Sequence, residues 1–362
     1  MKSLGIAIPT IGLNIKCLEA CLDSVINQTI SFNEVVLFDN TVDQNLSILI
    51  NKRFHKNIRI VQSKGQLKAC DSWNAAVRTL SSDRVMLLGD DDVLDSNFVE
   101  TYIKNYTSLS CPVLLPFRII DEQGRFIREL SWKKGHISPE LFIKLRLEGR
   151  IHIRIGGVVF SAEDFESVGG IIESGFENLW FVDDLLWITL ALKANAIRVA
   201  DEVCWSYREI SNWAGGVYDI EVIEHSLPKI IEKYTNICAR FNLDKEALEY
   251  LVTETEKKVV KLWLMRSVLP NLKDSNYQEA FLIIKNFLGL KLKSSLKLYG
   301  ILILLKIFKK FCSSKIRILK KLLREIIRPF KRILLARIVD KPMDNYYFKK
   351  YETRVEQEDV RR

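Results

Sequence analysis

The chain is poor in the residues that build zinc and disulfide sites. Only 4 of its 362 residues are histidine and 7 are cysteine, and no two cysteines have C-x-x-C spacing. Zinc sites take closely spaced ligands, so we expect none. Scattered cysteines fit a reducing compartment, and Pro9, Thr10 and Gly12 interrupt the N-terminal apolar stretch where a signal peptide would need continuity. We therefore expect a cytoplasmic protein.

Long hydrophobic runs are also missing. The most apolar stretch, residues 296–311, contains four lysines, whereas a spanning helix needs about 20 predominantly apolar residues. A transmembrane helix is therefore not expected in this stretch.

Acidic residues are nearly absent from residues 281–339, which hold 16 Lys and Arg but one acid, Glu325. The net charge there is +15, which leaves the rest of the chain at −6. Within it, residues 314–339 alternate apolar and basic side chains at near-helical spacing, a pattern typical of a helix on an anionic membrane surface. Few aromatics and no recognisable motif argue against nucleic acid. A helical subdomain with a solvated basic face is the alternative.

Short apolar runs alternate with helical patterns through the first 217 residues. Strands are predicted at residues 4–8, 34–38, 57–61, 84–88, 112–120, 153–161, 197–199 and 203–207, and helices at 15–26, 66–80 and 182–193. This alternation predicts an α/β fold with a mostly parallel sheet flanked by helices. Residues 218–362 are almost purely helical in pattern and form the second predicted domain, an all-α region with basic amphipathic helices.

The most informative motif is Gly89-Asp90-Asp91-Asp92, directly after the apolar run 84–88. Open α/β sheets bind ligands where such strands end, and hard oxygen ligands there suit Mg²⁺ or Mn²⁺ holding a diphosphate. A helix N-terminus capped by Asp92 or Asp95 is the alternative. That alternative explains one acidic residue well and three poorly.

Several motifs in order make the first 215 or so residues resemble family 2 glycosyltransferases, which are inverting enzymes with the GT-A fold. The resembling segments lie at residues 6–10, 21–29, 35–40, 63–65, 73–76, 88–94, 158–165, 168–170 and 182–185. Each segment alone is a weak signal, but their order and spacing together are specific. The resemblance implies that Asp92 ligates Mn²⁺ or Mg²⁺, with Asp90 nearby, and that Asp90 and Asp91 also contact the donor.

The resemblance also implies a nucleotide site at the neighbouring strand ends. Asp39 would accept the N3–H of uracil or thymine, and Pro9 and Thr10 would touch the uridine. Lys64 is a candidate phosphate contact. A turn aspartate and an exposed lysine are the simpler alternatives for Asp39 and Lys64.

An inverting transfer needs a base for the acceptor hydroxyl. The resemblance assigns this role to Asp184, with Asp183 in place of the usual glutamate. Trp180, just before this pair, is a candidate for stacking on the acceptor sugar, and a core position is the alternative. Helix N-capping is the alternative for either aspartate. Many relatives carry a histidine shortly after a Tyr-Arg pair; Tyr207-Arg208 is followed by none, so Arg208 is a candidate for the phosphates instead.

Together these observations predict an inverting glycosyltransferase that moves a hexose from a UDP-sugar, or a dTDP-sugar, to a sugar hydroxyl. The resemblance and the basic C-terminal region imply a polyprenyl diphosphate-linked saccharide acceptor at the inner face of the cell membrane, in O-antigen or capsule synthesis. A nucleotidyltransferase of related fold and an inactive membrane-attached sugar-binding scaffold are the alternatives. The former usually has a Gly-rich basic loop after its first strand, which residues 8–13 lack.

Overall fold

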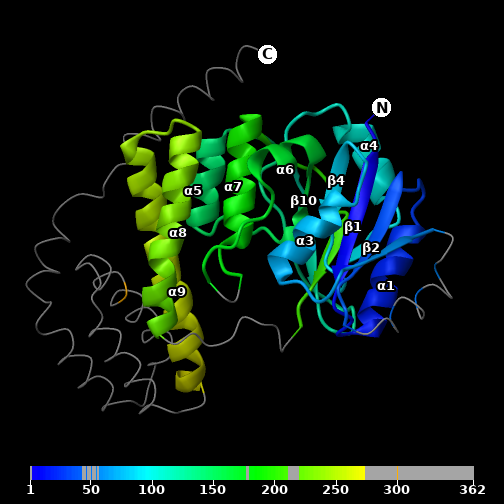
Figure 1. The fold of residues 1–362 in the computed structure, drawn as a ribbon, viewed down its shortest axis with the longest axis horizontal. Helices are drawn as coiled ribbons and strands as arrows, with labels where there is room; N and C mark the ends of the chain where they lie inside the picture. Colours follow the sequence, from blue (N-terminus) through cyan, green and yellow to red (C-terminus); the bar gives the residue numbers. More distant parts are fainter. Residues whose placement is uncertain are drawn as a thin grey trace, which may run out of the picture. The chain divides into compact units, whose positions relative to one another are not determined.

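A computed structural model of the chain describes residues 2–42, 57–176, 179–210 and 220–273, together with positions 46, 50, 54 and 300. The chain divides into two compact units, residues 1–214 and 215–362 (Figure 1). The predicted boundary at 217 falls in the stretch 211–219, outside the described residues. The predicted amphipathic segments 296–311 and 314–339 also lie outside them, apart from position 300.

The first unit alternates strands and helices, as the sequence predicts. Its elements are β1 (Leu4–Thr10), α1 (Ile15–Ile26), β2 (Glu34–Asp39), β3 (Arg59–Gln62), α3 (Ala69–Arg78), β4 (Arg84–Leu87), β5 (Val93–Leu94), α4 (Phe98–Tyr106), β6 (Val113–Leu114), β7 (Phe117–Ile120), β8 (Phe126–Leu130), β9 (Gly135–Ile137), α5 (Pro139–Leu147), the 3₁₀ turn η1 (Ile155–Gly157), β10 (Val158–Ser161), α6 (Ala162–Val168), α7 (Val182–Ala194), β11 (Ile197–Val199) and β12 (Trp205–Arg208).

Among the described residues, the main sheet has eight strands in the order β3-β2-β1-β4-β10-β6-β11-β9. The first four are parallel to one another, β10 runs antiparallel to both of its neighbours, and β6 and β11 are parallel. The chain moves outward from β1 to β3 and then returns to β4 on the other side of β1. Ligands bind at such a reversal of strand order, outside the carboxyl ends of the strands.

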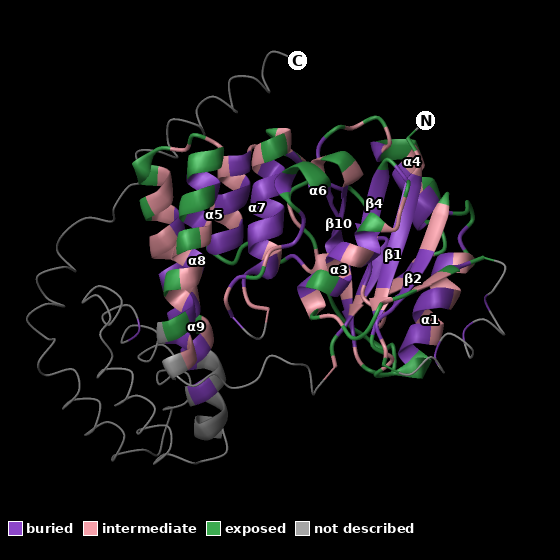
Figure 2. Ribbon diagram, in the orientation of Figure 1, coloured by how far each residue is buried: buried purple, intermediate pink, exposed green. Residues whose placement is uncertain are grey.

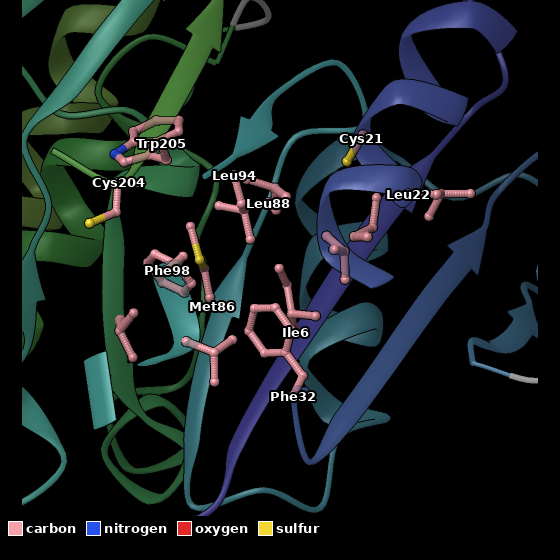
Figure 3. Close-up of a cluster of buried hydrophobic side chains, with 14 of the residues drawn as sticks. Ile6, Cys21, Leu22, Phe32, Met86, Leu88, Leu94, Phe98, Cys204 and Trp205 are labelled. Carbon is pink, nitrogen blue, oxygen red and sulfur yellow. The ribbon is translucent and has the colours of Figure 1, made fainter. Parts of the chain in front are cut away.

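The central strands β1 and β4 are buried along almost their whole length (Figure 2). Successive side chains of a strand point to opposite faces, so these strands contribute to a core on each face of the sheet. On one face, Ile6 of β1 and Met86 of β4 are buried with Leu22 of α1 and Phe98 of α4 (Figure 3). On the other face, α3 packs on β1, β2 and β4. Gly5 permits a close approach there, because a Cβ at this position would lie 2.7 Å from the Ser82 hydroxyl.

Two amide side chains from the resembling segments are explained by this packing. Asn74 of α3 donates from Nδ2 to the carbonyl of Ile171 and accepts from its N–H, both at 2.7 Å. Gln28 donates to the carbonyl of Asp95 at 2.7 Å and accepts from the N–H of Val99 at 3.1 Å. Buried backbone groups need such partners, so both amides fix loops that border the sheet.

Most of the predicted strands differ from those observed at their ends, and three differences bear on the site. Residues 112–120 form two strands, β6 and β7, which belong to different sheets, since β7 joins a smaller sheet of order β5-β12-β7-β8 among the described residues. Residues 155–157 form a 3₁₀ turn before β10. Strand β1 continues through Pro9 to Thr10. Proline is tolerated at position 9 because its backbone nitrogen, which has no N–H to donate, faces β4. The pairing of β4 with β1 has already ended at the Ala7–Leu87 pair.

The described part of the second unit consists of α8 (Ile220–Arg240) and α9 (Lys245–Lys273), which pack against each other. The short connection between them makes an antiparallel helical hairpin. This agrees with the predicted helical character. Among the described residues, no helix combines the length and apolar character that a bilayer crossing requires.

Candidate functional site

The ends of β1, β2 and β4 meet at the point where strand order reverses. Thr10 ends β1 and is paired in register with Asp39, the last residue of β2. The Thr10 hydroxyl donates to Asp90 Oδ2 at 2.5 Å and accepts from the N–H of Gly12 at 3.0 Å. Three segments that are distant in sequence therefore converge where the sequence places the nucleotide and the acidic motif.

The acidic loop Gly89–Asp92 turns its last carboxylate inward. Asp92 is 2% exposed, and its Oδ1 accepts the backbone N–H of Arg208 at 3.0 Å. A Cβ at Gly89 or at Gly156 would lie 3.1 or 3.3 Å from Asp92 Oδ2. Glycine at both positions therefore leaves room for this carboxylate.

The three carboxyl groups resist ionisation together. Burial raises the pKa of Asp90. Burial and the neighbouring negative charge of Asp90 raise the pKa of Asp91 to about 6. Burial, followed by the charge of Asp91, raises the pKa of Asp92 well above its usual range. A bound cation stabilises the ionised form of such a cluster, so this loop favours a positively charged partner.

The donor chemistry of the loop fits a hard divalent cation, since carboxylate oxygens are what Mg²⁺ and Mn²⁺ prefer. Among the described residues, no group of three or more histidine, cysteine or acidic side chains is arranged to hold a metal ion together. Mg²⁺ is commonly bound by one or two carboxylates with substrate phosphates completing its shell. Asp90 and Asp92, the predicted ligands, fit that kind of shared site.

Arg208, which the sequence offers as a candidate for the phosphates, holds the acidic loop, and its contact with phosphate stays a prediction. Its Nε donates to the carbonyl of Asp91 at 2.8 Å, and its Nη1 donates to the carbonyls of Asp121 at 3.2 Å and Glu122 at 3.1 Å. The guanidinium thus ties the acidic loop to the turn between β7 and β8. These contacts direct Nε and Nη1 at backbone oxygens rather than at a ligand.

Asp39 has the turn geometry that was the simpler alternative to a base contact. It is 0% exposed, and its Oδ1 accepts the N–H of Thr41 at 2.9 Å and the Thr41 hydroxyl at 2.6 Å. The next residue, Asn40, exchanges hydrogen bonds of 2.9 and 2.8 Å with the backbone of Leu67. This places the loop after β3, which carries the exposed Lys64, beside the end of β2. Contacts of Asp39 and Lys64 with a nucleotide stay predictions, as does that of the partly buried Pro9.

Asp183 and Asp184 lie in the first turn of α7. The N-cap is Phe181, which makes no side-chain capping bond, so the N-capping alternative is wrong for both aspartates. Leu179 and Phe181 have φ values of 64° and 66°. Such left-handed conformations are costly for side chains of this kind and gather at functional sites.

The two aspartates have different surroundings. Asp184 is 3% exposed, and its Oδ1 lies 2.6 Å from Nε of Arg146, while Nη2 of Arg146 donates to Oδ2 at 3.5 Å. Asp183 is only partly buried. Trp180 packs in an aromatic group with ring centroids 5.9 Å from Phe176 and 6.5 Å from Phe181. Its stacking on an acceptor sugar stays a prediction.

Sequence reasoning missed Arg146 and Arg154, both of which touch predicted or neighbouring site residues. Arg146 pairs with an aspartate 38 positions away, and the guanidinium of Arg154 lies over the Tyr207 ring. No local pattern distinguishes these arginines from exposed ones.

Comparison with known proteins identifies the domain type. Residues 6–168 match the family model described as "Glycosyl transferase family 2", so this segment is a glycosyl transferase family 2 domain. No curated protein matches the chain.

Solved structures are similar in fold. The structure of S. aureus TarS 1–349 is 16% identical and has a TM-score of 0.50, covering 86% of this chain and 81% of that chain. S. aureus TarS 1–349 in complex with UDP is 15% identical (TM-score 0.47; 77% and 89% covered), and its complex with UDP-GlcNAc is 14% identical with the same score and coverage. At these identities the likeness concerns the fold alone, and the likeness to the TarS 1–349 structure with a TM-score of 0.50 confirms the predicted GT-A-like arrangement.

Proposed function

We propose that this protein is an inverting glycosyltransferase that transfers a hexose from a UDP-sugar, or a dTDP-sugar, to a sugar hydroxyl. The observation that carries the proposal is the convergence of Thr10, Asp39 and the acidic loop at the reversal of strand order, within a domain of the family 2 type. A nucleotide-sugar donor needs polar groups for both its diphosphate and its nucleoside, and this edge of the sheet brings such groups together.

The proposed reaction is a single displacement. The bond between the anomeric carbon and the diphosphate oxygen breaks, and its electron pair stays on the diphosphate. The acceptor oxygen bonds to the anomeric carbon from the opposite face, and its proton passes to a carboxylate base. An α-linked donor would therefore give a β-linked product.

Asp184 is the proposed base and Arg146 the group that orients it. A general base is commonly held in position by a third side chain. Nε of Arg146 makes the closer contact, with Oδ1 of Asp184, and Nη2 of Arg146 makes the longer one, with Oδ2 of Asp184. Asp183, one position earlier in the same helical turn, provides a matched comparison for this assignment.

Asp90 and Asp92 would hold Mg²⁺ or Mn²⁺ when it is bound. The cation would supply positive charge to the diphosphate as negative charge develops on the leaving oxygen. Support comes from the oxygen donors of the loop and from the raised pKa values of its three carboxyl groups.

The proposed acceptor is a saccharide on polyprenyl diphosphate, used in O-antigen or capsule synthesis. Support comes from the +15 net charge of residues 281–339, which suits an anionic membrane surface at the cytoplasmic side. The proposal predicts that the full chain binds vesicles containing anionic lipid and that deletion of residues 296–362 abolishes this binding. Equal flotation of both proteins with such vesicles would refute the membrane assignment.

The experiment that tests the reaction is a donor panel. Full-length protein with Mn²⁺ and a GlcNAc- or GalNAc-diphospho-lipid is mixed with individual UDP- and dTDP-sugars, and products are followed by mass. UDP-GlcNAc is a natural first donor, because S. aureus TarS has been crystallised with it. We expect one donor to give a chelator-sensitive, β-linked product. Absence of both product and UDP binding would reject the proposal in favour of an inactive scaffold.

A further inference from the structure

Arg154 lies beside the acidic loop on a segment that the mechanism above does not use. It directly precedes the 3₁₀ turn η1, and Gly156, two residues on, packs against Asp92. Its guanidinium carbon lies 4.7 Å from the centre of the Tyr207 ring, a cation–π contact. Tyr207 belongs to β12, the strand whose last residue, Arg208, holds the acidic loop.

The guanidinium of Arg154 is close to carboxylates without being neutralised by one. Its Nε is buried without a hydrogen-bond partner, and no carboxylate oxygen lies within 4.0 Å in the described part of the chain. Its positive charge nevertheless acts on Asp92, opposing the effect of burial on that carboxyl. Arg208 differs, because its Nε and Nη1 donate to three backbone carbonyls.

Such an arrangement favours a bound anion. A buried donor without a partner is costly, and a charged one more so, unless a ligand supplies the missing acceptor. The guanidinium presents a planar fork of N–H groups that matches phosphate oxygens, and the Tyr207 ring restricts its plane. The acidic loop beside it is the proposed site of the cation that would hold a diphosphate.

We propose that Arg154 binds the diphosphate of the nucleotide-sugar donor and stabilises the charge that it gains on departure. This inference rests on the proposed function and adds a residue to it. When the bond to the anomeric carbon breaks, the electron pair remains on the diphosphate oxygen, and the guanidinium, already oriented, interacts with that oxygen more strongly. Arg154 then both binds the sugar donor and stabilises its departing diphosphate.

The test compares ligands that differ in phosphate number. Calorimetric binding of UDP, UMP and uridine, at fixed Mn²⁺, is measured on the full-length wild type, Arg154→Gln, Arg154→Lys and Arg150→Gln. Arg150 is the matched control, since it lies four positions earlier in the same loop with a side chain 66% exposed and a 3.7 Å contact to Glu148.

We expect Arg154→Gln to weaken UDP binding about 10- to 100-fold, the usual effect of losing a charged hydrogen bond. Uridine binding should change less than about threefold, because uridine carries no phosphate for the guanidinium to bind. Arg154→Lys should lie between, since it keeps the charge without the fork, and Arg150→Gln should match the wild type.

Equal losses for UDP and uridine, or no loss for either, would overturn the inference and leave Arg154 as a packing partner of Tyr207. The same measurements separate this from failure of the proposed function. A wild-type protein that binds no nucleotide rejects both, whereas one that binds UDP unchanged by Arg154→Gln rejects only the role of Arg154. Should Arg154→Gln unfold, Arg154→Lys decides: UDP binding equal to that of the wild type would contradict a bidentate phosphate contact.

Discussion

Replacing Asp91 by asparagine should stabilise the metal-free protein at neutral pH. Burial and the charge of Asp90 raise the pKa of Asp91 from 3.8 to about 6. A change of one in pKa corresponds to about 1.4 kcal/mol, so ionising this carboxyl costs the folded state about 3 kcal/mol relative to the unfolded chain. This figure is an upper limit, because the side chain is only partly buried and water screens the charge.

The sign follows from proton binding. The folded protein holds the Asp91 proton more tightly than the unfolded chain does, so the carboxyl contributes no penalty below about pH 4. The penalty grows as the pH rises towards about 6 and is complete above it. Asp91→Asn removes the penalty, so its advantage over the wild type should be largest at pH 7 to 8 and vanish near pH 4.

The assay is urea unfolding followed by tryptophan fluorescence, in chelator, at several pH values between about 4 and 8. Asp83→Asn is the control of opposite sign. Hydrogen bonds of 2.8 and 2.9 Å from Ser3 lower the pKa of Asp83, so its contribution is present at neutral pH and lost as the pH falls. An Asp91→Asn protein that is less stable than the wild type at pH 7.5, or whose advantage does not vary with pH, would refute this account of the loop.

Other predictions concern the base and the packing. Asp184→Asn should lower kcat by about 10²- to 10⁴-fold while leaving UDP affinity within about twofold, because a general base acts on the acceptor. Asp183→Asn should lower kcat less. A larger loss of kcat for Asp183→Asn than for Asp184→Asn in a steady-state assay would assign the base to Asp183. Asn74→Ala should lower the free energy of unfolding by about 2 to 4 kcal/mol, because the N–H and carbonyl of Ile171 lose their partners. An unchanged urea midpoint for that variant would contradict the second expectation.

Much of the fold could be predicted because the signals are local. Helix α1 begins and ends where its apolar spacing indicates, at Ile15 and Ile26, and β2 and β4 follow their apolar runs. The acidic motif and Asp39 both follow such strands. Parallel strands bring their carboxyl ends to one edge, so the convergence of these residues could be expected from sequence.

What could not be predicted depends on contacts between distant residues. Strand β10 enters the sheet antiparallel between β4 and β6, and the short run at residues 112–120 divides between two sheets. The partners of the site residues are equally remote: Arg208 bonds Asp92 across 116 positions and Arg146 meets Asp184 across 38. Periodicity carries no information about pairings of this kind.

The two arginines beside the acidic loop differ in how far the sequence points to them. Arg208 follows a tyrosine in the expected motif, yet its Nε and Nη1 donors are occupied by carbonyls, whereas Arg154 carries no motif and has a buried Nε without a partner. Three carboxyl groups and two guanidinium groups share this edge, so adding a diphosphate leaves an excess of negative charge. A divalent cation would offset that excess. We therefore expect Arg154→Gln to weaken UDP binding more at low Mn²⁺ than at saturating Mn²⁺, and equal weakening at both concentrations would show that the two positive charges act independently.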